Sequence, residues 1–415
     1  MTRRAACLAL SPIARDGRVL RQLRALTARF DVTAVGYDPC RSGLPADLAG
    51  RVRVVALDVP RQGRAVDRLA KGAWLAAGRL APALAYPRWY ARYELYRSAA
   101  SALVACHPEL VVANDWNALP AAEQAAEKTG AALLVDLHEY APRQWEHRRV
   151  WRWLWRPAVV YFLHRHLPRV DGAVTVSARL AAAYAREFGV RPAVVRNAPA
   201  PVALPPFRPC RPDLVRLIHH GVATPARRLE RTIDAVAAAG APFHLDLMLV
   251  SGDEAYIERL RRHARDTAPD RVRLRSPVPP DEIVTTLSDY DAGLLMIPPI
   301  TWHYRHALPN KLFEFVAAGL CVCTAPSPDM AAFVRENDCG AVADGHTAHD
   351  MARLLASLTP AKVDRYRRHA REAGRHVNAH TEAEALLSAA EAALRQRDIR
   401  REKAGGDHGL AARGT

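Results

Sequence analysis

The sequence predicts an α/β protein built from two doubly wound parallel sheets. Short apolar runs typical of buried parallel strands alternate with longer Ala-, Leu- and Arg-rich stretches that have a helical pattern. This alternation stops at residues 197–212, where six of sixteen residues are proline, and then starts again. Since 415 residues exceed what one ordinary hydrophobic core accommodates, we expect two domains of similar size.

The strand candidates follow each other along the chain. In the first half they are Ala5–Leu10, Val32–Val35, Val52–Leu57, Leu110–Ala113, Ala132–Asp136, Gly172–Thr175 and Ala193–Arg196. In the second half they are Val215–His219, Phe243–Val250, Val272–Leu274, Ala292–Met296, Cys321–Thr324 and Gly340–Val342. We expect domains over residues 1–198 and 213–378, a Pro-rich linker over 199–212, a C-terminal helix over 379–397 that packs back toward the first domain, and a flexible tail over 398–415.

The net charge of +16 lies almost entirely in the first half of the chain. Residues 1–200 carry 30 basic and 16 acidic residues, and two segments, 60–97 and 141–169, supply most of the excess. Both segments interleave Arg with Trp and Tyr, a composition that suits a helix in the headgroup region of an anionic membrane. The alternative is that the aromatic residues form a core and the Arg residues a solvated surface. Nucleic acid is a less suitable partner because no nucleic-acid-binding module is recognisable.

Cysteine usage and hydropathy predict a cytoplasmic protein. The seven cysteines form no CxxC pair, which favours a reducing compartment. The apolar run 5–10 is short and leads into Ser11-Pro12, so we interpret it as a strand and not as a signal peptide. No run approaches the roughly 18 to 20 apolar residues of a spanning helix, which leaves peripheral binding to the inner face of a membrane as the expected mode of attachment.

The strongest motif is Ala307-Leu-Pro-Asn-Lys-Leu-Phe-Glu-Phe-Val-Ala-Ala-Gly319. Pro309 predicts a helix start, and the unpaired N–H groups of a first helical turn attract anions. Lys311 adds a positive charge there, with Glu314 three residues further along. The alternative is an ordinary helix with a Lys/Glu surface pair.

A second motif is His219-His-Gly-Val-Ala-Thr-Pro-Ala-Arg-Arg-Leu-Glu230. We expect a strand that ends at Gly221, followed by a turn and a helix that Arg227 and Arg228 open. Such a helix start would favour phosphate. Taken singly, each of these Arg residues is equally consistent with a solvated surface.

Together these motifs resemble the retaining, nucleotide-sugar-dependent glycosyltransferases of family 4. The resemblance runs over nearly the whole chain and also rests on residues 16–23, 114–115, 136–139, 170–177, 195–199, 249–252 and 276–278. It implies the GT-B architecture, in which two Rossmann-like domains face each other with a cleft between them. The C-terminal domain would then bind the nucleotide sugar and the N-terminal domain the acceptor.

The resemblance implies specific site residues. Arg227 and Lys311 would neutralise the donor diphosphate, so that no metal is needed. Glu314 would accept hydrogen bonds from the ribose hydroxyls, and His138 would lie near the reacting bond as the catalytic residue. The remaining donor residues would be Gly221, Ser276, Val278, Leu308, Pro309 and Asn310, and the acceptor residues Gly17, Arg18, Asn114 and Asp115.

The chain departs from the family pattern at a few positions. His306 stands where the first Glu of the family motif would fall, Val222 where many members have Arg or Gly, and the glycine pair after the first strand is absent. These departures bear on the choice of donor sugar. Asp289-Tyr290-Asp291 has the DxD spacing of a metal-binding motif, but its expected position in a helix-to-strand turn argues against a metal site.

The function expected from the resemblance is retaining transfer of a sugar from UDP or GDP to an acceptor hydroxyl, without a metal or an organic cofactor. The acceptor could be a glycan, a small molecule or a lipid-linked, membrane-proximal compound. Three alternatives stay open at this point: a non-catalytic sugar-nucleotide-binding protein, a nucleotide-sugar epimerase, and, suggested only by charge, a nucleic-acid-binding protein.

Overall fold

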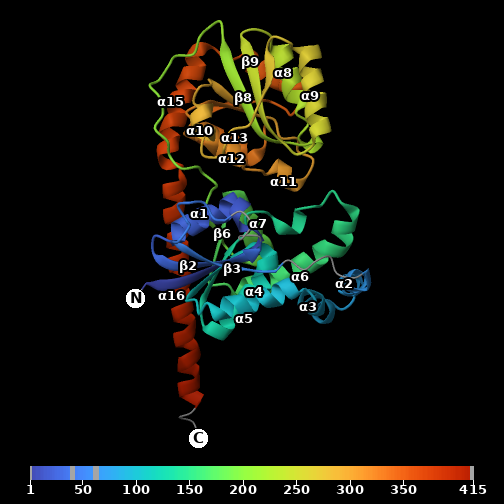
Figure 1. Ribbon diagram of the computed structural model, residues 1–415, viewed down its shortest axis with the longest axis vertical. Helices are drawn as coiled ribbons and strands as arrows, with labels where there is room; N and C mark the ends of the chain where they lie inside the picture. Colours follow the sequence, from blue (N-terminus) through green and yellow to red (C-terminus); the bar gives the residue numbers. More distant parts are fainter. Residues whose placement is uncertain (1, 38–42, 59–64, 412–415) are drawn as a thin grey trace. The chain divides into compact units, whose positions relative to one another are not determined.

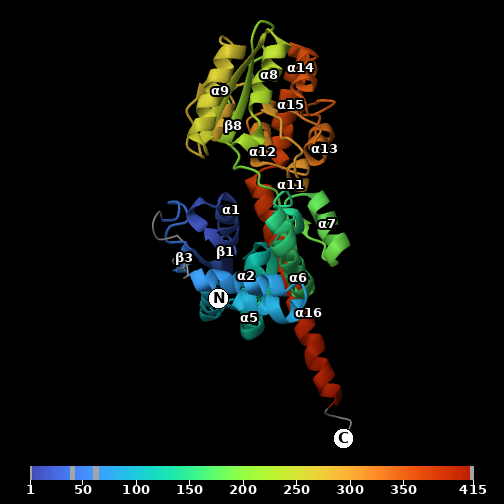
Figure 2. The same ribbon diagram turned by 90° about the vertical axis from the view of Figure 1, so that its right-hand side faces the viewer.

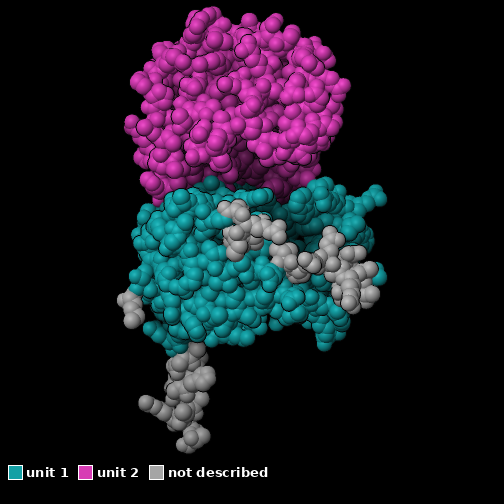
Figure 3. All heavy atoms as spheres, viewed as in Figure 1, with its two compact units in different colours: residues 1–196, 383–415 teal, residues 197–382 magenta. Residues whose placement is uncertain are grey.

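The computed structural model of the protein describes residues 2–37, 43–58 and 65–411 (Figure 1). Internal contacts divide the chain into two compact units, residues 1–196 with 383–415 and residues 197–382, which we call unit 1 and unit 2 (Figure 3). Each unit is built on one parallel sheet covered by helices, so the predicted fold class is confirmed. A strand occurs at every position where the sequence predicts one.

Within the described residues, unit 1 contains a seven-stranded sheet in the order β3-β2-β1-β4-β5-β6-β7. All neighbouring strands are parallel. The strands are β1 (Arg3–Pro12), β2 (Phe30–Tyr37), β3 (Val52–Ala56), β4 (Leu110–Asn114), β5 (Ala132–Asp136), β6 (Gly172–Thr175) and β7 (Ala193–Val194). Because the strands are parallel, the carboxyl ends of the central strands β1, β4 and β5 meet at one edge of the sheet, where ligands bind in folds of this kind.

Helices cover both faces of this sheet. Helices α1 and α16 share a hydrophobic core with β1, whereas α4 and α5 pack on the opposite face. The helices of unit 1 are α1 (Gly17–Leu26), α2 (Ala65–Ala77), α3 (Pro82–Ala91), α4 (Glu94–Ala105), α5 (Asp115–Thr129), α6 (Arg156–His166), α7 (Ala178–Phe188) and α16 (Ala379–Ala411). Short turns of helix are η1 (Ile13–Arg15), η2 (Ala141–Arg143), the π-helical η3 (Trp151–Trp155) and η4 (Leu167–Arg169).

Unit 2 has a six-stranded parallel sheet in the order β10-β9-β8-β11-β12-β13. Its strands are β8 (Val215–Ala223), β9 (Phe243–Ser251), β10 (Val272–Arg275), β11 (Ala292–Leu295), β12 (Cys321–Thr324) and β13 (Gly340–Val342). On one face α8 lies between α9 and α14, and α12 and α15 cover the other (Figure 2). The helices are η5 (Pro225–Arg227), α8 (Glu230–Ala239), α9 (Glu254–Thr267), α10 (Ile283–Leu287), α11 (Trp302–Arg305), α12 (Asn310–Ala317), α13 (Pro328–Glu336), α14 (Ala348–Ala356) and α15 (Pro360–His376).

The Pro-rich segment expected as a linker is held against α15 in unit 2. The backbone N–H of Cys210 donates to Asp364, and Arg367 and Arg371 donate to carbonyl groups of the segment. The ring of Phe207 lies within 5.2 Å of the guanidinium carbons of both these arginines. These contacts explain why a segment without helix or strand nevertheless has a defined path.

The C-terminal helix is longer than the sequence predicts. Helix α16 continues to Ala411, although we expected a flexible tail from residue 398; residues 412–415 lie outside the described residues. Residues 400–403 are Arg, Arg, Glu and Lys, which have high helix propensity. Arg400 also donates hydrogen bonds to the carbonyls of Arg169 and Val170, which ties this stretch to the body of unit 1.

Most of the aromatic residues in the basic segments form a small core of their own. Tyr86, Trp89 and Tyr90 of α3 are buried against Phe162 of α6, with ring centroids 5.4 to 6.4 Å from that residue. For these residues the alternative interpretation, a packed core, is the correct one. Trp153, in contrast, is 62% exposed.

Candidate functional site

The first candidate site lies at the carboxyl end of β8 in unit 2. Strand β8 pairs with β9 as far as Ala223, so it extends two residues past Gly221, where we expected it to end. Gly221 has φ +115°, a backbone conformation that residues with a side chain rarely adopt. A Cβ atom there would lie 2.6 Å from Cε and 2.8 Å from Nζ of Lys311, so the glycine leaves room for the amine.

Lys311 is a buried cation. It sits in the first turn of α12, which begins at Asn310 with Pro309 as N-cap and without a capping hydrogen bond from that side chain. Burial and the nearby Arg227 guanidinium lower the pKa of Lys311 from 10.5 to about 7, and the Glu314 carboxylate only partly offsets them. The protein itself therefore supplies too little negative charge to stabilise the protonated amine. A bound anion would supply that charge, so a lowered lysine pKa of this kind is expected in an anion-binding site.

Two buried histidines adjoin the amine. His220 Nε2 lies 3.2 Å from Glu314 Oε2, although the two atoms are not aligned for a hydrogen bond. His219 bonds through Nδ1 to the carbonyl of Leu294, and Nε2 has no hydrogen-bond partner within the described chain. Burial, and then the charge of Lys311, lowers the pKa of His219 well below its usual range. The site thus gathers several basic groups around one carboxylate.

Arg227 is placed differently from the prediction. It belongs to the short helix η5, and Arg228 follows with φ +48°, so the α-helix α8 begins only at Glu230. The two arginines therefore precede the helix and do not open it. Arg227 is nevertheless close enough to Lys311 and His219 to lower the pKa of both.

Three further predicted donor residues lie next to β10 and α12. Ser276 and Val278 follow the edge strand β10; Ser276 is exposed and Val278 packs partly against the core. Leu308 also packs against that core, directly before α12. His306, in place of the family's first Glu, lies with Nδ1 3.2 Å from Oδ2 of Asp329.

The second candidate site lies at the carboxyl ends of β1, β4 and β5 in unit 1. Arg18 forms two hydrogen bonds to Asp136, of 2.6 and 2.8 Å, and a third to the carbonyl of Val195. Asp136 is fully buried and also accepts a hydrogen bond from Gln22. Sequence reasoning did not identify Asp136 as a site residue, since its partner Arg18 is 118 residues away. These contacts favour a positioning role for Arg18 over direct binding of an acceptor.

Asp115 and His138 form an acid–imidazole pair beside this ion pair. Asp115 Oδ2 lies 3.3 Å from His138 Nε2, and Asp115 has φ +65° at the start of α5. Burial raises the pKa of Asp115 to about 6, although His138 acts in the other direction. Burial disfavours protonated His138, but Asp115 and Asp136 outweigh it and raise its pKa. His138 Nδ1 has no hydrogen-bond partner among the described residues.

Gly17 and Asn114 complete the predicted set in unit 1. Gly17 is the first residue of α1, whose N-cap Asp16 accepts hydrogen bonds from the backbone N–H groups of Arg18 and Val19. The Asp16 carboxylate thus already accepts hydrogen bonds from the backbone N–H groups at the start of α1. Asn114 Nδ2 donates to the carbonyl of Leu8, and its Oδ1 has no partner within the described chain.

The structure gives no support to a metal site at the DxD sequence. Asp291 is buried at the start of β11, where Oδ2 accepts a hydrogen bond of 2.9 Å from the backbone N–H of Arg216 and Oδ1 lies 3.5 Å from Arg367. Among the residues that the structure describes, no group of three or more His, Cys, Asp or Glu side chains is arranged to hold a metal ion. None of the described helices is long and apolar enough to cross a membrane.

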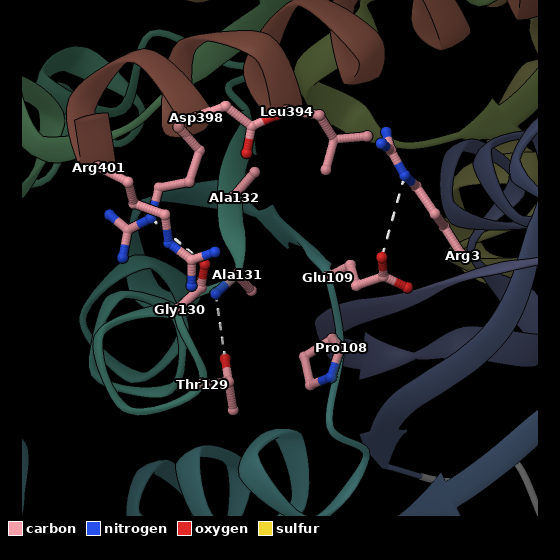
Figure 4. A pocket seen from close by; sticks show the side chains of 11 residues that line it. Arg3, Pro108, Glu109, Thr129, Gly130, Ala131, Ala132, Leu394, Asp398 and Arg401 are labelled. Atoms are coloured by element: carbon pink, nitrogen blue, oxygen red, sulfur yellow. Dashed lines mark hydrogen bonds and ion pairs between the residues drawn. The ribbon is translucent and has the colours of Figure 1, made fainter.

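A cavity of about 120 Å³ lies elsewhere in unit 1 (Figure 4). It is at the amino ends of β1 and β5, between Arg3, Glu109 and Arg401. This is the edge of the sheet opposite to the one with His138. Because the strand ends that carry the predicted residues do not reach this cavity, we do not assign it to the functional site.

Comparison with known proteins places the chain among glycosyltransferases. Residues 17–203 match the sequence profile of Glycosyltransferase Family 4, and residues 227–394 match a profile described as Glycosyl transferase-like. A comparison with curated protein sequences finds no significant match.

Solved structures of similar fold cover nearly the whole chain. HepE from Anabaena in complex with UDP superposes with a TM-score of 0.65 at 14% identity, over 93% of this chain and 98% of HepE. The α,α-trehalose 6-phosphate synthase of Burkholderia multivorans gives 0.64 at 13% identity, over 98% and 99% of the two chains. A glycosyltransferase of Rickettsia africae gives 0.64 at 10% identity, over 95% and 99%. At such low identity these structures bear on the fold alone.

Proposed function

This chain is a glycosyltransferase with the GT-B fold, and we propose that it is a retaining enzyme of family 4 that uses a nucleoside diphosphate sugar as donor. Unit 2 would bind the donor and unit 1 the acceptor. The observation that carries the proposal is the buried Lys311 amine, whose pKa falls to about 7 because burial and Arg227 outweigh Glu314. A bound diphosphate would supply the missing negative charge.

We assign the donor contacts by charge and hydrogen-bonding capacity. Lys311, Arg227 and the uncapped first turn of α12 would hold the diphosphate, since backbone N–H groups at a helix start attract phosphate. Glu314, beside His220, would accept hydrogen bonds from the ribose hydroxyls. Ser276 and Val278 would contact the base. UDP is our first candidate nucleotide because HepE was solved with UDP and with UDP-glucose, and an E. coli protein of similar fold was solved with UDP-2-fluoro glucose.

The proposed reaction requires no metal. The acceptor oxygen attacks the anomeric carbon on the face from which the phosphate departs, while the bond between that carbon and the phosphate oxygen breaks. The acceptor proton passes to the departing phosphate. The two cations, Arg227 and Lys311, would stabilise the charge that develops on this leaving phosphate, as fixed positive groups also do on transferring phosphoryl groups.

His138 would contact the donor sugar or the reacting bond. Its raised pKa and its contact with Asp115 favour an imidazole that donates a hydrogen bond. The buried pair of Arg18 and Asp136 would position the surrounding strand ends. The acceptor hydroxyl would belong to a glycan or a lipid-linked compound near a membrane.

The proposal is tested first by nucleotide binding. A thermal-shift comparison of UDP, GDP, ADP and TDP should show stabilisation by one diphosphate, because ligand stabilisation grows as RT ln(1 + [L]/Kd). The corresponding UDP- or GDP-sugar should then be hydrolysed slowly or transferred by the wild type but not by Glu314→Gln or Lys311→Met. Binding without turnover would support the non-catalytic alternative, and turnover to an epimer without acceptor would support the epimerase. Absence of binding by all four nucleotides would contradict the proposal.

A further inference from the structure

Helix α2 has an apolar outer face. Among residues 69–77, the part of α2 whose side chains the structure describes, the exposed positions recur at the i, i+3, i+4, i+7 spacing of one helical stripe, and they are Leu69, Gly72, Ala73, Ala76 and Ala77. Trp74 and Leu75 face the protein and join the aromatic core. A surface helix normally shows polar residues to solvent, so this arrangement leaves an apolar stripe without a covering element among the described residues.

The turn after α2 extends this stripe. All five residues from Leu80 to Leu84 are exposed and apolar, with Leu80 93% and Leu84 53% exposed. A second segment adds the exposed Val150 and Trp153. Arg79 joins the two segments, because its guanidinium donates to the carbonyl of Trp153 at 2.8 Å and lies 4.7 Å from the indole ring.

We call the surface formed by Leu69, Leu80, Leu84, Val150 and Trp153 the apolar face. It is carried by α2, the turn that follows it, the start of α3, and η3 with the residue before it. Helix α2 packs against both α3 and η3, and Figure 1 shows α2 beside α3. Five exposed large apolar side chains on elements that pack against one another indicate an interaction site, whereas scattered single ones carry no such meaning.

Positive charge surrounds the apolar face. Residues 69–92 and 143–156 contain nine Lys or Arg and one acidic residue, Glu146, which is paired with Arg143. Arg88, Arg92, Arg149 and Arg152 are exposed. A second copy of this chain would bring like charges together at this surface, so a homodimer contact is disfavoured. Nucleic acid would be attracted by the charge but makes no use of exposed leucines.

We propose that the apolar face inserts into the headgroup region of an anionic lipid bilayer, with the surrounding arginines paired to lipid phosphates. Leucine and tryptophan side chains at this depth are typical of helices that lie in the plane of a membrane, and arginines extend toward the headgroups. The inference rests on the proposed function only in placing the acceptor at the membrane; the surface itself is argued from exposure and charge.

The test uses the full-length protein and two kinds of vesicle, pure phosphatidylglycerol and pure phosphatidylcholine. The wild type should co-sediment with phosphatidylglycerol vesicles at low salt. The triple variant Leu80→Ser, Leu84→Ser, Trp153→Ser should bind these vesicles about a hundredfold more weakly or worse, since three apolar side chains no longer enter the bilayer. Ile399→Ser, at a similarly apolar and exposed position on α16, is the matched control and should bind normally.

A second variant tests the charge. Arg148→Gln, Arg149→Gln, Arg152→Gln should lower affinity for phosphatidylglycerol on the order of a hundredfold, at about fivefold for each cation. It should not change the weak binding to phosphatidylcholine. UDP-glucose binding, measured by calorimetry on every variant, should be unchanged, which separates this inference from the donor-site proposal and confirms that the variants fold.

Three results would overturn the inference. They are absence of wild-type binding to phosphatidylglycerol, undiminished binding by the Leu80/Leu84/Trp153 variant, and a wild-type dimer in solution that this variant abolishes in the absence of any vesicle binding. The last result would assign the apolar face to a second copy of the chain.

Discussion

Binding of a donor should draw a proton into the Lys311 site, and the amount should rise between pH 6 and pH 8. In the free protein the amine has a pKa of about 7, so at pH 8 only about a tenth of the molecules carry the proton. A diphosphate in contact with the amine would raise this pKa by about two units. The expected uptake is then about 0.8 proton per UDP-glucose bound at pH 8 and about 0.1 at pH 6.

Isothermal titration calorimetry measures this uptake directly. The heat of binding is compared in two buffers of different ionisation enthalpy at the same pH, and the difference gives the number of protons exchanged. UDP-glucose is the suitable probe because its diphosphate does not titrate in this range. GDP-mannose would replace it if the nucleotide panel selects GDP.

Two substitutions identify the group that takes up the proton. Lys311→Arg keeps the positive charge but removes the titration, so proton uptake at pH 8 should fall close to zero. Lys311→Met removes both and should weaken donor binding by about 10- to 100-fold, the loss expected for a hydrogen bond to a charged group. Uptake that is unchanged in Lys311→Arg, or that falls between pH 6 and pH 8 in the wild type, would refute the assignment.

The same depressed pKa has a consequence for stability. Since the folded protein holds the Lys311 proton less tightly than the unfolded chain, stability of the ligand-free protein should rise with pH between about 7 and 10.5. At pH below 7, where the amine is protonated in both states, the buried charge lowers the free energy of unfolding by at most about 5 kcal/mol. Lys311→Met should therefore raise the unfolding temperature of the apo protein at pH 6 while weakening its donor binding.

Three further substitutions follow from particular contacts. Gly221→Ala should weaken UDP-glucose binding at least tenfold in calorimetry, because the added Cβ would meet the Lys311 side chain at 2.6 Å. Asp136→Asn should lower the unfolding temperature markedly, by the equivalent of about 3–5 kcal/mol, since it leaves Arg18 buried without its countercharge. Asp291→Asn should destabilise the protein by about 1–3 kcal/mol, and EDTA should leave donor binding by the wild type unchanged.

The Gly221 substitution has a matched control, and each of the other two predictions has a result that would contradict it. Gly240→Ala places a side chain at φ +74° with no atom within 4 Å, so it carries the backbone strain of Gly221→Ala without the crowding and should bind donor normally. Equal losses in the two glycine variants would attribute the Gly221 effect to strain alone. A stable Asp136→Asn protein would show that the buried pair contributes little, and loss of donor binding in EDTA would contradict the metal-independent mechanism.

Local sequence patterns determined the secondary structure and its order. The periodicity of apolar residues located every strand, because a buried parallel strand must be apolar whatever its neighbours are. The proline-rich segment was recognisable for the same reason, since proline cannot continue a helix or a central strand. The donor motif around Lys311 was also visible, because the residues of one helix turn are close in sequence.

Boundaries that depend on tertiary contacts were less predictable. Strand β8 extends beyond Gly221 because β9 offers it pairing partners as far as Ser251. Helix α16 continues past residue 397 where Arg400 finds carbonyl acceptors on another segment. Neither partner is visible in the local sequence.

The electrostatic character of the sites was decided by the tertiary structure alone. Asp136 acquires its partner from residue 18, and the Lys311 pKa depends on burial and on Arg227, 84 residues earlier in the chain. The basic aromatic segments show the same division: composition predicted either a core or a membrane surface, and the fold assigned Trp89 to the first and left Trp153 exposed. Composition and periodicity specify which side chains are available, whereas burial and pKa depend on distances between residues far apart in the chain, and only the folded structure sets those distances.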